Sequence, residues 1–456
     1  MRARPIALLL VSLSLSASAA SAAPIPGEER FGSVAAPSQQ RTVTAGISVN
    51  QIGEDSFASL SLGTELVLEK VGVGLRVPLN FRVIDGDPEA TGDLPGGIRG
   101  EDWDEGIDYL RVLRYIRYGQ KRDPIYARLG ELAADLGHGT ILGRYLNNVD
   151  LDTYRLGLQV DVNRPEGGVE TIVSDVGRLA TDSDASNVRG ARLHVRPWQF
   201  IDPESRLTMV ATGFTVVSDG TAPQDLADSD DLDSQTVFGF DAEALVHSSE
   251  TLDVLPYTDL NFIADAGWGW HLGTLMQLRP PIGLIFPIRL EYRLFASDYL
   301  PTYFSTFYEL ERHSFPLGAS GGVPKAQAVD AADDSEVING YLIDAGVDVW
   351  GAFQLGTILE GHEGVDPTLA AFLNVPALRI IQFKAYYTRT RITGTDDVLA
   401  FDDRSLVIAE GRYQMIPAVF LVGRLTRQWV RTEEAGVVSH EPVDTWGIGV
   451  EAVLEL

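Results

Sequence analysis

Hydrophobic and polar residues alternate along most of this chain, in short runs separated by turn-forming residues. In residues 71–83 every second position is Val, Leu or Phe, and the positions between them hold Gly, Arg, Pro or Asn. A period of two places successive side chains on opposite faces of a β-strand. The pattern is equally clear in 156–163, 267–278, 288–294 and 446–456, and it recurs in 57–69, 108–118, 124–133, 189–197, 205–217, 235–247, 252–263, 340–350, 352–360, 376–389, 404–413 and 417–429. These runs, with a weaker one at 42–50, predict an all-β chain.

The polar faces of the runs help to distinguish between kinds of β-protein. A soluble sandwich or solenoid would also alternate, but many polar faces here carry charges in mid-run, as at Arg289, Glu291 and Arg293. Such charges suit a wet lumen, with the apolar face turned toward lipid. Aromatic residues near the run ends resemble interfacial girdles: Trp198, Trp268, Trp350, Tyr386, Tyr387, Trp429 and Trp446. We therefore expect residues 42–456 to form one transmembrane up-and-down antiparallel β-barrel of about 16–18 strands.

The N-terminus has the pattern of an export signal. Arg2 and Arg4 precede a short apolar stretch over 6–15, and small residues follow as far as Ala22. The stretch is shorter than the ~20 residues that span a bilayer, so we expect a signal peptide over 1–22, cleaved after Ala22 or alternatively after Ala19. Residues 23–41 would then form a flexible mature N-terminus, and the protein would pass through the periplasm to the outer membrane. The chain has no Cys, which excludes a lipoprotein anchor and disulfides.

The acidic excess of the chain is concentrated between the runs. The formal net charge is −28, and the connections at 85–108 and 219–233 hold many of the acidic residues. A nucleic-acid partner is therefore not expected, because phosphate binding needs clustered positive charge. Long connections alternating with very short ones are typical of outer-membrane barrels. The partners expected of such a barrel are outer-membrane lipid and lipopolysaccharide, the barrel-assembly machinery and small solutes.

Two connections stand out from plain turns. In the long one at 297–339, the aromatic residues Tyr303, Phe304, Phe307 and Tyr308 recur at helical spacing after a proline, which predicts a short amphipathic helix. That helix would lie either in the barrel mouth or at the membrane surface. The Gly-rich stretch 136–147 is either a simple turn or a loop tucked inward, with His138 and Arg144 reaching carboxylates in the lumen.

One part of the chain carries specific motifs. They are IRGEDWD at 98–104, RYIRYG at 114–119, KRDP at 121–124, YARLG at 126–130, LGHGTILGRYLN at 136–147, YF at 303–304 and FYELER at 307–312. Together they resemble an uncharacterised family of large predicted outer-membrane β-barrel proteins of diderm bacteria. The resemblance implies a location and a fold, and it implies no catalytic residue. Outside these motifs only the strand pattern agrees.

Motifs for catalysis and metal binding are weak. The segment 318–322 matches G-x-S-x-G, but prolines flank it where the hydrolase motif needs a strand and a helix. The acidic segment 228–233 lacks the glycine and the final glutamate of a calcium loop. The seven histidines show no ligand spacing, and no nucleotide-binding motif occurs. We expect no cofactor, no metal site and no enzymatic activity.

The leading functional hypothesis is a porin-like channel for the passive passage of small solutes. Charges on opposing lumen walls would select solutes by size and charge. The candidate lumen residues are Arg76, Arg82, Arg289, Glu291, Arg293, Lys384, Glu410, Arg412, Arg424 and Arg427. The alternative is a structural or assembly barrel plugged by the long loop, and an outer-membrane enzyme is a third hypothesis.

Overall fold

The computed structural model describes residues 40–52, 54–86, 97–103, 106–149, 153–181, 187–220, 234–316, 323–330, 336–378, 380–402, 404–434 and 437–455. The expected signal peptide, almost all of the expected N-terminal segment, the G-x-S-x-G sequence and the acidic segment 228–233 lie outside these residues. No helix in the described ranges is both long enough and apolar enough to cross a membrane.

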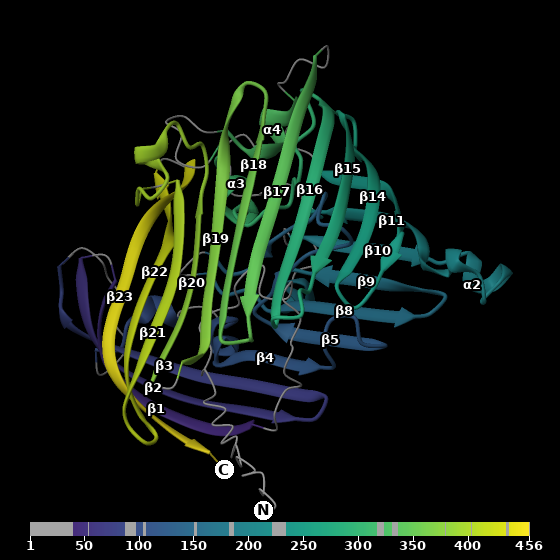
Figure 1. Ribbon diagram of the computed structural model, residues 1–456. Helices are drawn as coiled ribbons and strands as arrows, with labels where there is room; N and C mark the ends of the chain where they lie inside the picture. The colour runs from purple at the N-terminus through teal and green to yellow at the C-terminus, as the bar shows by residue number, and fades with distance from the viewer. Residues whose placement is uncertain are drawn as a thin grey trace, which may run out of the picture.

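Twenty antiparallel strands form a closed barrel, in which each strand pairs with its neighbours along the chain (Figure 1). β1 closes the ring by pairing with β23, from Thr42 opposite Glu455 to Ile52 opposite Thr445. The strands are β1 Gln40–Ile52, β2 Asp55–Leu68, β3 Val71–Ile84, β4 Leu113–Tyr118, β5 Ile125–Gly130, β8 Gly157–Arg164, β9 Gly167–Val173, β10 Arg189–Val195, β11 Val210–Ser218, β12 Thr236–Ala244, β14 Leu252–Ile263, β15 Trp268–Leu278, β16 Leu284–Ala296, β17 Val337–Val349, β18 Phe353–His362, β19 Val365–Leu378, β20 Ile381–Arg389, β21 Ser405–Ile416, β22 Val419–Glu434 and β23 Val437–Glu455. The predicted up-and-down barrel is confirmed.

The alternation does not predict β9 and β19, which explains why the barrel exceeds the expected count of about 16–18 strands. The inward face of each is partly apolar: Ile172 on β9, and Ala370 and Phe372 on β19, are buried among other hydrophobic side chains. A strand that is apolar on both faces loses its period of two. These strands therefore face a lumen that is filled by protein at that point.

The two rims of the barrel differ. One rim carries both ends of the sheet and short turns such as 69–70, 165–166 and 417–418. The start of β1 and the end of β23 lie side by side at this end, where Thr42 is opposite Glu455. The opposite rim carries the long connections 85–112, 131–156, 174–188, 297–336 and 390–404. In outer-membrane barrels the short turns face the periplasm and the long loops face outward.

The remaining elements are short. Inside the barrel, β6 Ala133–Ala134 pairs with β7 Tyr145–Leu146, and β13 His247–Ser248 extends the pairing of β14 beyond the end of β12. The helices are η2 Gly100–Asp102, η3 Asp108–Val112, α1 Val176–Thr181, α2 Trp198–Ile201, η4 Arg206–Met209, α3 Tyr308–Glu311, α4 Lys325–Asp330 and η6 Thr395–Asp397.

Two segments of the long connections fold into the lumen. We call residues 131–149 the first insert and residues 297–316 the second insert. They meet at a parallel bridge between Leu142 and Phe304, and the amide of Thr302 donates to the carbonyl of Thr140 at 2.9 Å. The helix expected after Pro301 forms only over its last turn, α3, because residues 303–307 run alongside the first insert instead.

The hydrophobic core of the protein lies within the barrel, where the inserts pack against the wall. One cluster joins both inserts to inward-facing residues of the wall from β9 to β16, and a second joins them to β17 through β22. Burying these apolar side chains supplies the favourable free energy that holds the segments inside a polar barrel.

Candidate functional site: the barrel lumen

The outer face of the barrel is apolar and its charges point inward. Exposed hydrophobic side chains on the outside include Val43, Ile47, Val49, Leu193, Phe214, Phe240, Leu260, Leu272, Leu290 and Ile343. A closed antiparallel barrel of this kind satisfies every backbone hydrogen-bonding group within lipid. The architecture is that of an outer-membrane barrel, and the lumen is therefore the candidate site.

A buried cluster of charges surrounds Glu291 on the wall formed by β14, β15 and β16. Arg293 Nε donates to this carboxylate at 2.6 Å, and Arg289 and the Tyr257 hydroxyl donate to it as well. His271 Nδ1 lies 3.1 Å away. We call Tyr257, His271, Arg289, Glu291 and Arg293 the Glu291 cluster. Its carboxylate is enclosed by donors, so the predicted lumen residues of β16 lie in a dry part of the interior.

Arg144 attaches the first insert to the far side of this cluster. Its guanidinium forms an ion pair with Glu360 on β18, and Glu360 also accepts from Arg293 Nη1 at 3.2 Å. The backbone amide of Arg144 donates to Asp135 Oδ1 at 2.7 Å, which holds the turn of the insert. The expectation that this arginine meets a lumen carboxylate agrees with these contacts.

His138 attaches the first insert to β12 and β14. Its ring nitrogens lie 2.8 Å from Asp259 and 2.9 Å from Glu243, and its ring stacks on Tyr257. Burial favours the neutral ring, but the two carboxylates outweigh burial and raise the pKa of His138 to about 9. The histidine is therefore a charged anchor at neutral pH. Gly137 beside it has a φ of +54°, and a Cβ there would come within 2.8 Å of Arg192 Nε, so the anchor needs glycine.

The second insert buries all four aromatic residues that the sequence singles out. Tyr303, Phe304, Phe307 and Tyr308 are each at most 3% exposed, and Phe307 meets Trp429 of β22 edge to face. Of the two placements expected for this segment, the structure therefore has the one inside the barrel.

Glu309 on α3 anchors the second insert to the first. It accepts from the Tyr145 hydroxyl and lies 3.3 Å from Arg155 and 3.4 Å from Arg312. Burial would raise the pKa of Glu309, but Arg155 and Arg312 hold it below its ordinary value. The charged carboxylate of Glu309 is thus buried between the two inserts. Tyr145, Arg155 and Arg312 together satisfy it there.

A second group of charges lies on β21, β22 and β23, away from the inserts. Arg412 donates to Glu410 and Glu451 at 2.9 Å each, and Arg424 donates to the same two carboxylates at 2.7 and 2.9 Å. We call these four residues the Glu451 cluster. The Arg424 side chain is 30% exposed, whereas Arg412, Glu410 and Glu451 are 2–6% exposed, as buried as the arginines of the Glu291 cluster at 5–12%. Water therefore reaches this cluster at Arg424.

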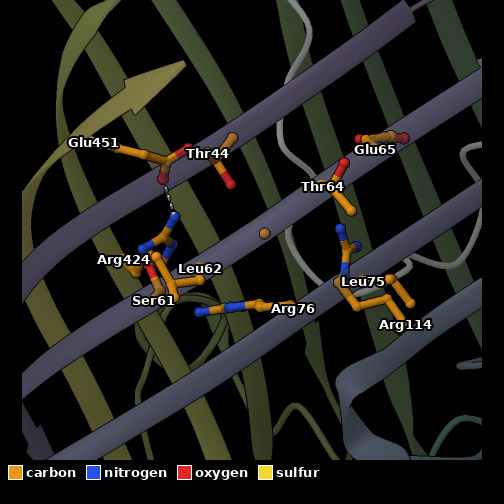
Figure 2. A pocket seen from close by; sticks show the side chains of 11 residues that line it. Thr44, Ser61, Leu62, Thr64, Glu65, Leu75, Arg76, Arg114, Arg424 and Glu451 are labelled. Carbon is orange, nitrogen blue, oxygen red and sulfur yellow. Dashed lines mark hydrogen bonds and ion pairs between the residues drawn. The ribbon is translucent and has the colours of Figure 1, made fainter. Parts of the chain in front are cut away.

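A small recess opens beside the Glu451 cluster (Figure 2). β1, β2 and β3 form its floor, and Arg76, Arg114 and Arg424 line it together with Thr44 and Ser61. Arg76 and Arg424 both lie nearer the short-turn ends of their strands. The recess therefore lies on that side of the lumen.

The remaining predicted lumen residues are placed as follows. Arg82 faces inward from β3 and forms an ion pair with Asp55. Lys384 lies opposite Glu410 in the pairing of β20 with β21. Arg427 differs from Arg424, because it pairs with Asp444 and with the carbonyl of Asp402 near the long-connection rim. It does not join the Glu451 cluster.

Several partner residues were missed by the sequence reading. Glu243, Asp259, Glu360 and Glu451 occupy inward positions of runs that the alternation does identify. Their place on the inward face of an alternating run is the sequence feature that could have identified them. Which of them meets which insert depends on contacts between residues far apart in the chain. In the described part of the chain, no group of three or more potential ligands could hold a metal ion.

Comparisons with known proteins give only loose likenesses. No family model matches the chain, and no curated protein sequence matches it. Among solved structures, the siderophore receptor PirA from Pseudomonas aeruginosa is 8% identical, with a TM-score of 0.36 and coverage of 92% of this chain and 81% of that one. Pseudomonas aeruginosa OpdL is 11% identical, with a TM-score of 0.34 and coverage of 91% and 98%. Pseudomonas aeruginosa OccK10 (OpdN) is 9% identical, with a TM-score of 0.34 and coverage of 91% and 99%. Likenesses at these TM-scores support no argument about function.

Proposed function

We propose that this protein is an outer-membrane channel for the passive passage of small solutes, and that its two inserts confine the path to one sector of the lumen. The proposal rests on the contrast between two parts of the lumen wall, the part on which the inserts pack and the part that borders the recess. The wall behind the inserts is dry and packed, including the halves of β21 and β22 nearer the long connections. The wall of β1 to β3 and the short-turn ends of β21 to β23 border the recess and keep polar side chains and the partly exposed Arg424.

The path would run along the second sector and past the Glu451 cluster. Arginine and glutamate side chains on adjacent strands set a local field that acts on passing ions, and the inserts limit the width available. Passage needs no chemical step, so the proposal includes no catalytic residue.

A second candidate function is a barrel with a closed lumen. It is favoured by residues 97–103 and 106–112, which lie nearer the long-connection rim and contact β3. Asn80 on β3 donates to Asp102 at 2.8 Å, and Arg99 and Asp108 in these ranges are buried. These contacts narrow the mouth above the recess.

Conductance in a planar bilayer tests the proposal. The refolded protein is first checked for heat-modifiability, because a closed barrel stays folded in cold SDS and migrates differently after boiling. We expect the folded protein to insert in discrete steps of small, uniform conductance. Folded, heat-modifiable protein that produces no steps would favour the closed barrel and overturn the channel proposal.

A further inference from the structure

Arg76 is an inward-facing cation without a carboxylate partner. It lies on β3 in the recess, and within the described ranges its guanidinium makes no hydrogen bond or ion pair with another residue. Arg82 lies on the same face of the same strand and pairs with Asp55. A half-buried charge without a partner is unfavourable unless water or a ligand satisfies it.

The charges around Arg76 do not supply that partner. Its charged neighbours are the cations Arg424 and Arg114 and the carboxylates Glu410 and Glu131. Glu410 already accepts from Arg412 and Arg424, and Glu131 lies 4.0 Å from Arg114. Figure 2 shows Arg76 on the floor of the recess between Arg424 and Arg114.

Two hydroxyl groups and two carboxylates complete the lining of the recess. Thr44 on β1 and Ser61 on β2 supply the hydroxyls, and Glu65 on β2 and Glu451 on β23 supply the carboxylates. Glu65 accepts from the Tyr115 hydroxyl, and Glu451 accepts from Arg412 and Arg424, so the three arginines that line the recess outnumber its two carboxylates. A planar guanidinium donates two parallel hydrogen bonds to a carboxylate or phosphate, and hydroxyl groups can donate to its remaining oxygens. The recess thus presents donors and a net cation to the lumen.

We propose that this recess binds the oxyanion group of small anionic solutes, a carboxylate or a phosphate, with Arg76 as its principal donor. The inference deepens the proposed channel function and rests on it in one respect only, which is that solutes reach the site through the lumen. It assigns a negative charge to the solutes that the site binds. It also distinguishes Arg76 from the lumen arginines that form ion pairs.

The first experiment measures binding without requiring an open pore. Phenylglyoxal modifies accessible guanidinium groups, and peptide mass spectrometry follows each arginine of the folded barrel separately. We expect Arg76 to react faster than Arg82, because Asp55 engages Arg82. Inorganic phosphate or acetate should slow the labelling of Arg76 several-fold and leave Arg82 unchanged. Protection by phosphate alone or by acetate alone would identify the preferred oxyanion, and absence of protection by either would overturn the site.

The second experiment measures selectivity. In a KCl gradient, we expect the reversal potential of the wild-type channel to show a preference for chloride, and Arg76→Gln to shift it toward potassium. Arg76→Lys should keep most of the preference, since the charge remains. Arg82→Gln is the matched control, because it removes one cation from the same face of the same strand. Equal shifts in Arg76→Gln and Arg82→Gln would show an effect of total charge and overturn the site. If no protein conducts, the channel proposal fails, and the labelling result alone decides on the site.

Discussion

Two parts of the lumen wall carry similar charged residues in similar spacing and differ in what lies over them. β16 holds Arg289, Glu291 and Arg293, while β21 holds Glu410 and Arg412. The first group lies in the wall sector on which the inserts pack, and its Arg293 reaches Glu360, to which Arg144 of the first insert is bound. The second group borders the recess, where Arg424 remains partly exposed.

The difference shows that an inward position on a strand does not determine whether a charge meets water. Both groups point into the lumen by the same alternation. The Glu291 cluster is part of the core that holds the inserts, whereas the Glu451 cluster faces the space through which we propose that solutes pass. Four measurements test this contrast.

Removing the second insert should have the largest effect on function. We predict that deleting Tyr299–Val337 and joining the ends by a short Gly-Ser turn raises single-channel conductance by about twofold or more, because the occluded sector then becomes part of the path. The strands remain paired, so the variant should stay heat-modifiable. An unchanged conductance in a folded deletion variant would show that the insert does not constrict the lumen.

Neutralising one carboxylate in each cluster should affect stability unequally. In Glu291→Gln the buried Arg289 keeps only the Tyr257 hydroxyl, and breaking such a buried pair costs about 3–5 kcal/mol. In Glu410→Gln both arginines keep Glu451, so no buried cation is left without a carboxylate and we expect a smaller loss than in Glu291→Gln. Urea unfolding of the detergent-refolded variants measures both free energies. Equal losses would show that Glu451 does not compensate for the missing carboxylate.

Raising the pH should loosen the first insert. The pKa of His138 is raised from 6.5 to about 9 in the folded protein. Its charged form therefore stabilises the folded state fully below pH 6.5, and this contribution is lost as the pH rises through about 9. We expect hydrogen exchange at residues 136–146, corrected for the intrinsic rate, to lose protection in that window.

His138→Gln serves as the control for this pH effect. Its exchange should be faster at neutral pH and should show no transition near pH 9, because the titrating group is absent. A transition that persists in this variant would assign the pH dependence to another group.

The smallest effect is expected at Arg427. Its ion pair with Asp444 lies near the rim, and the Asp444 side chain is 49% exposed. Exposed pairs contribute about 0–1 kcal/mol, so Arg427→Gln should change the urea midpoint little and leave the conductance unchanged. A shift of the reversal potential as large as that of Arg76→Gln would place Arg427 on the solute path and move the path toward the rim.

Local sequence patterns specify most of the strands, most of their inward and outward faces and the division into short turns and long connections. Period-two alternation is a local property, so 71–83 and 288–294 already predict β3 and β16 and the inward direction of Arg76 and Arg289. The aromatic residues at 303–308 likewise indicate a segment that other parts of the protein or the membrane must cover. Their spacing does not identify what covers them.

Only the tertiary structure decided what fills the lumen. The bridge between Leu142 and Phe304 and the ion pair of Arg144 with Glu360 join residues far apart in the chain, and no local pattern encodes such pairings. The inward faces of β9 and β19 are partly apolar because the inserts pack on them, which is why alternation missed those strands. The contacts of the inserts also decide that Arg289 is enclosed while Arg76, on an equally regular strand, is left facing a recess. A charge on an alternating strand has a fixed direction, but its environment depends on whether another segment packs over it.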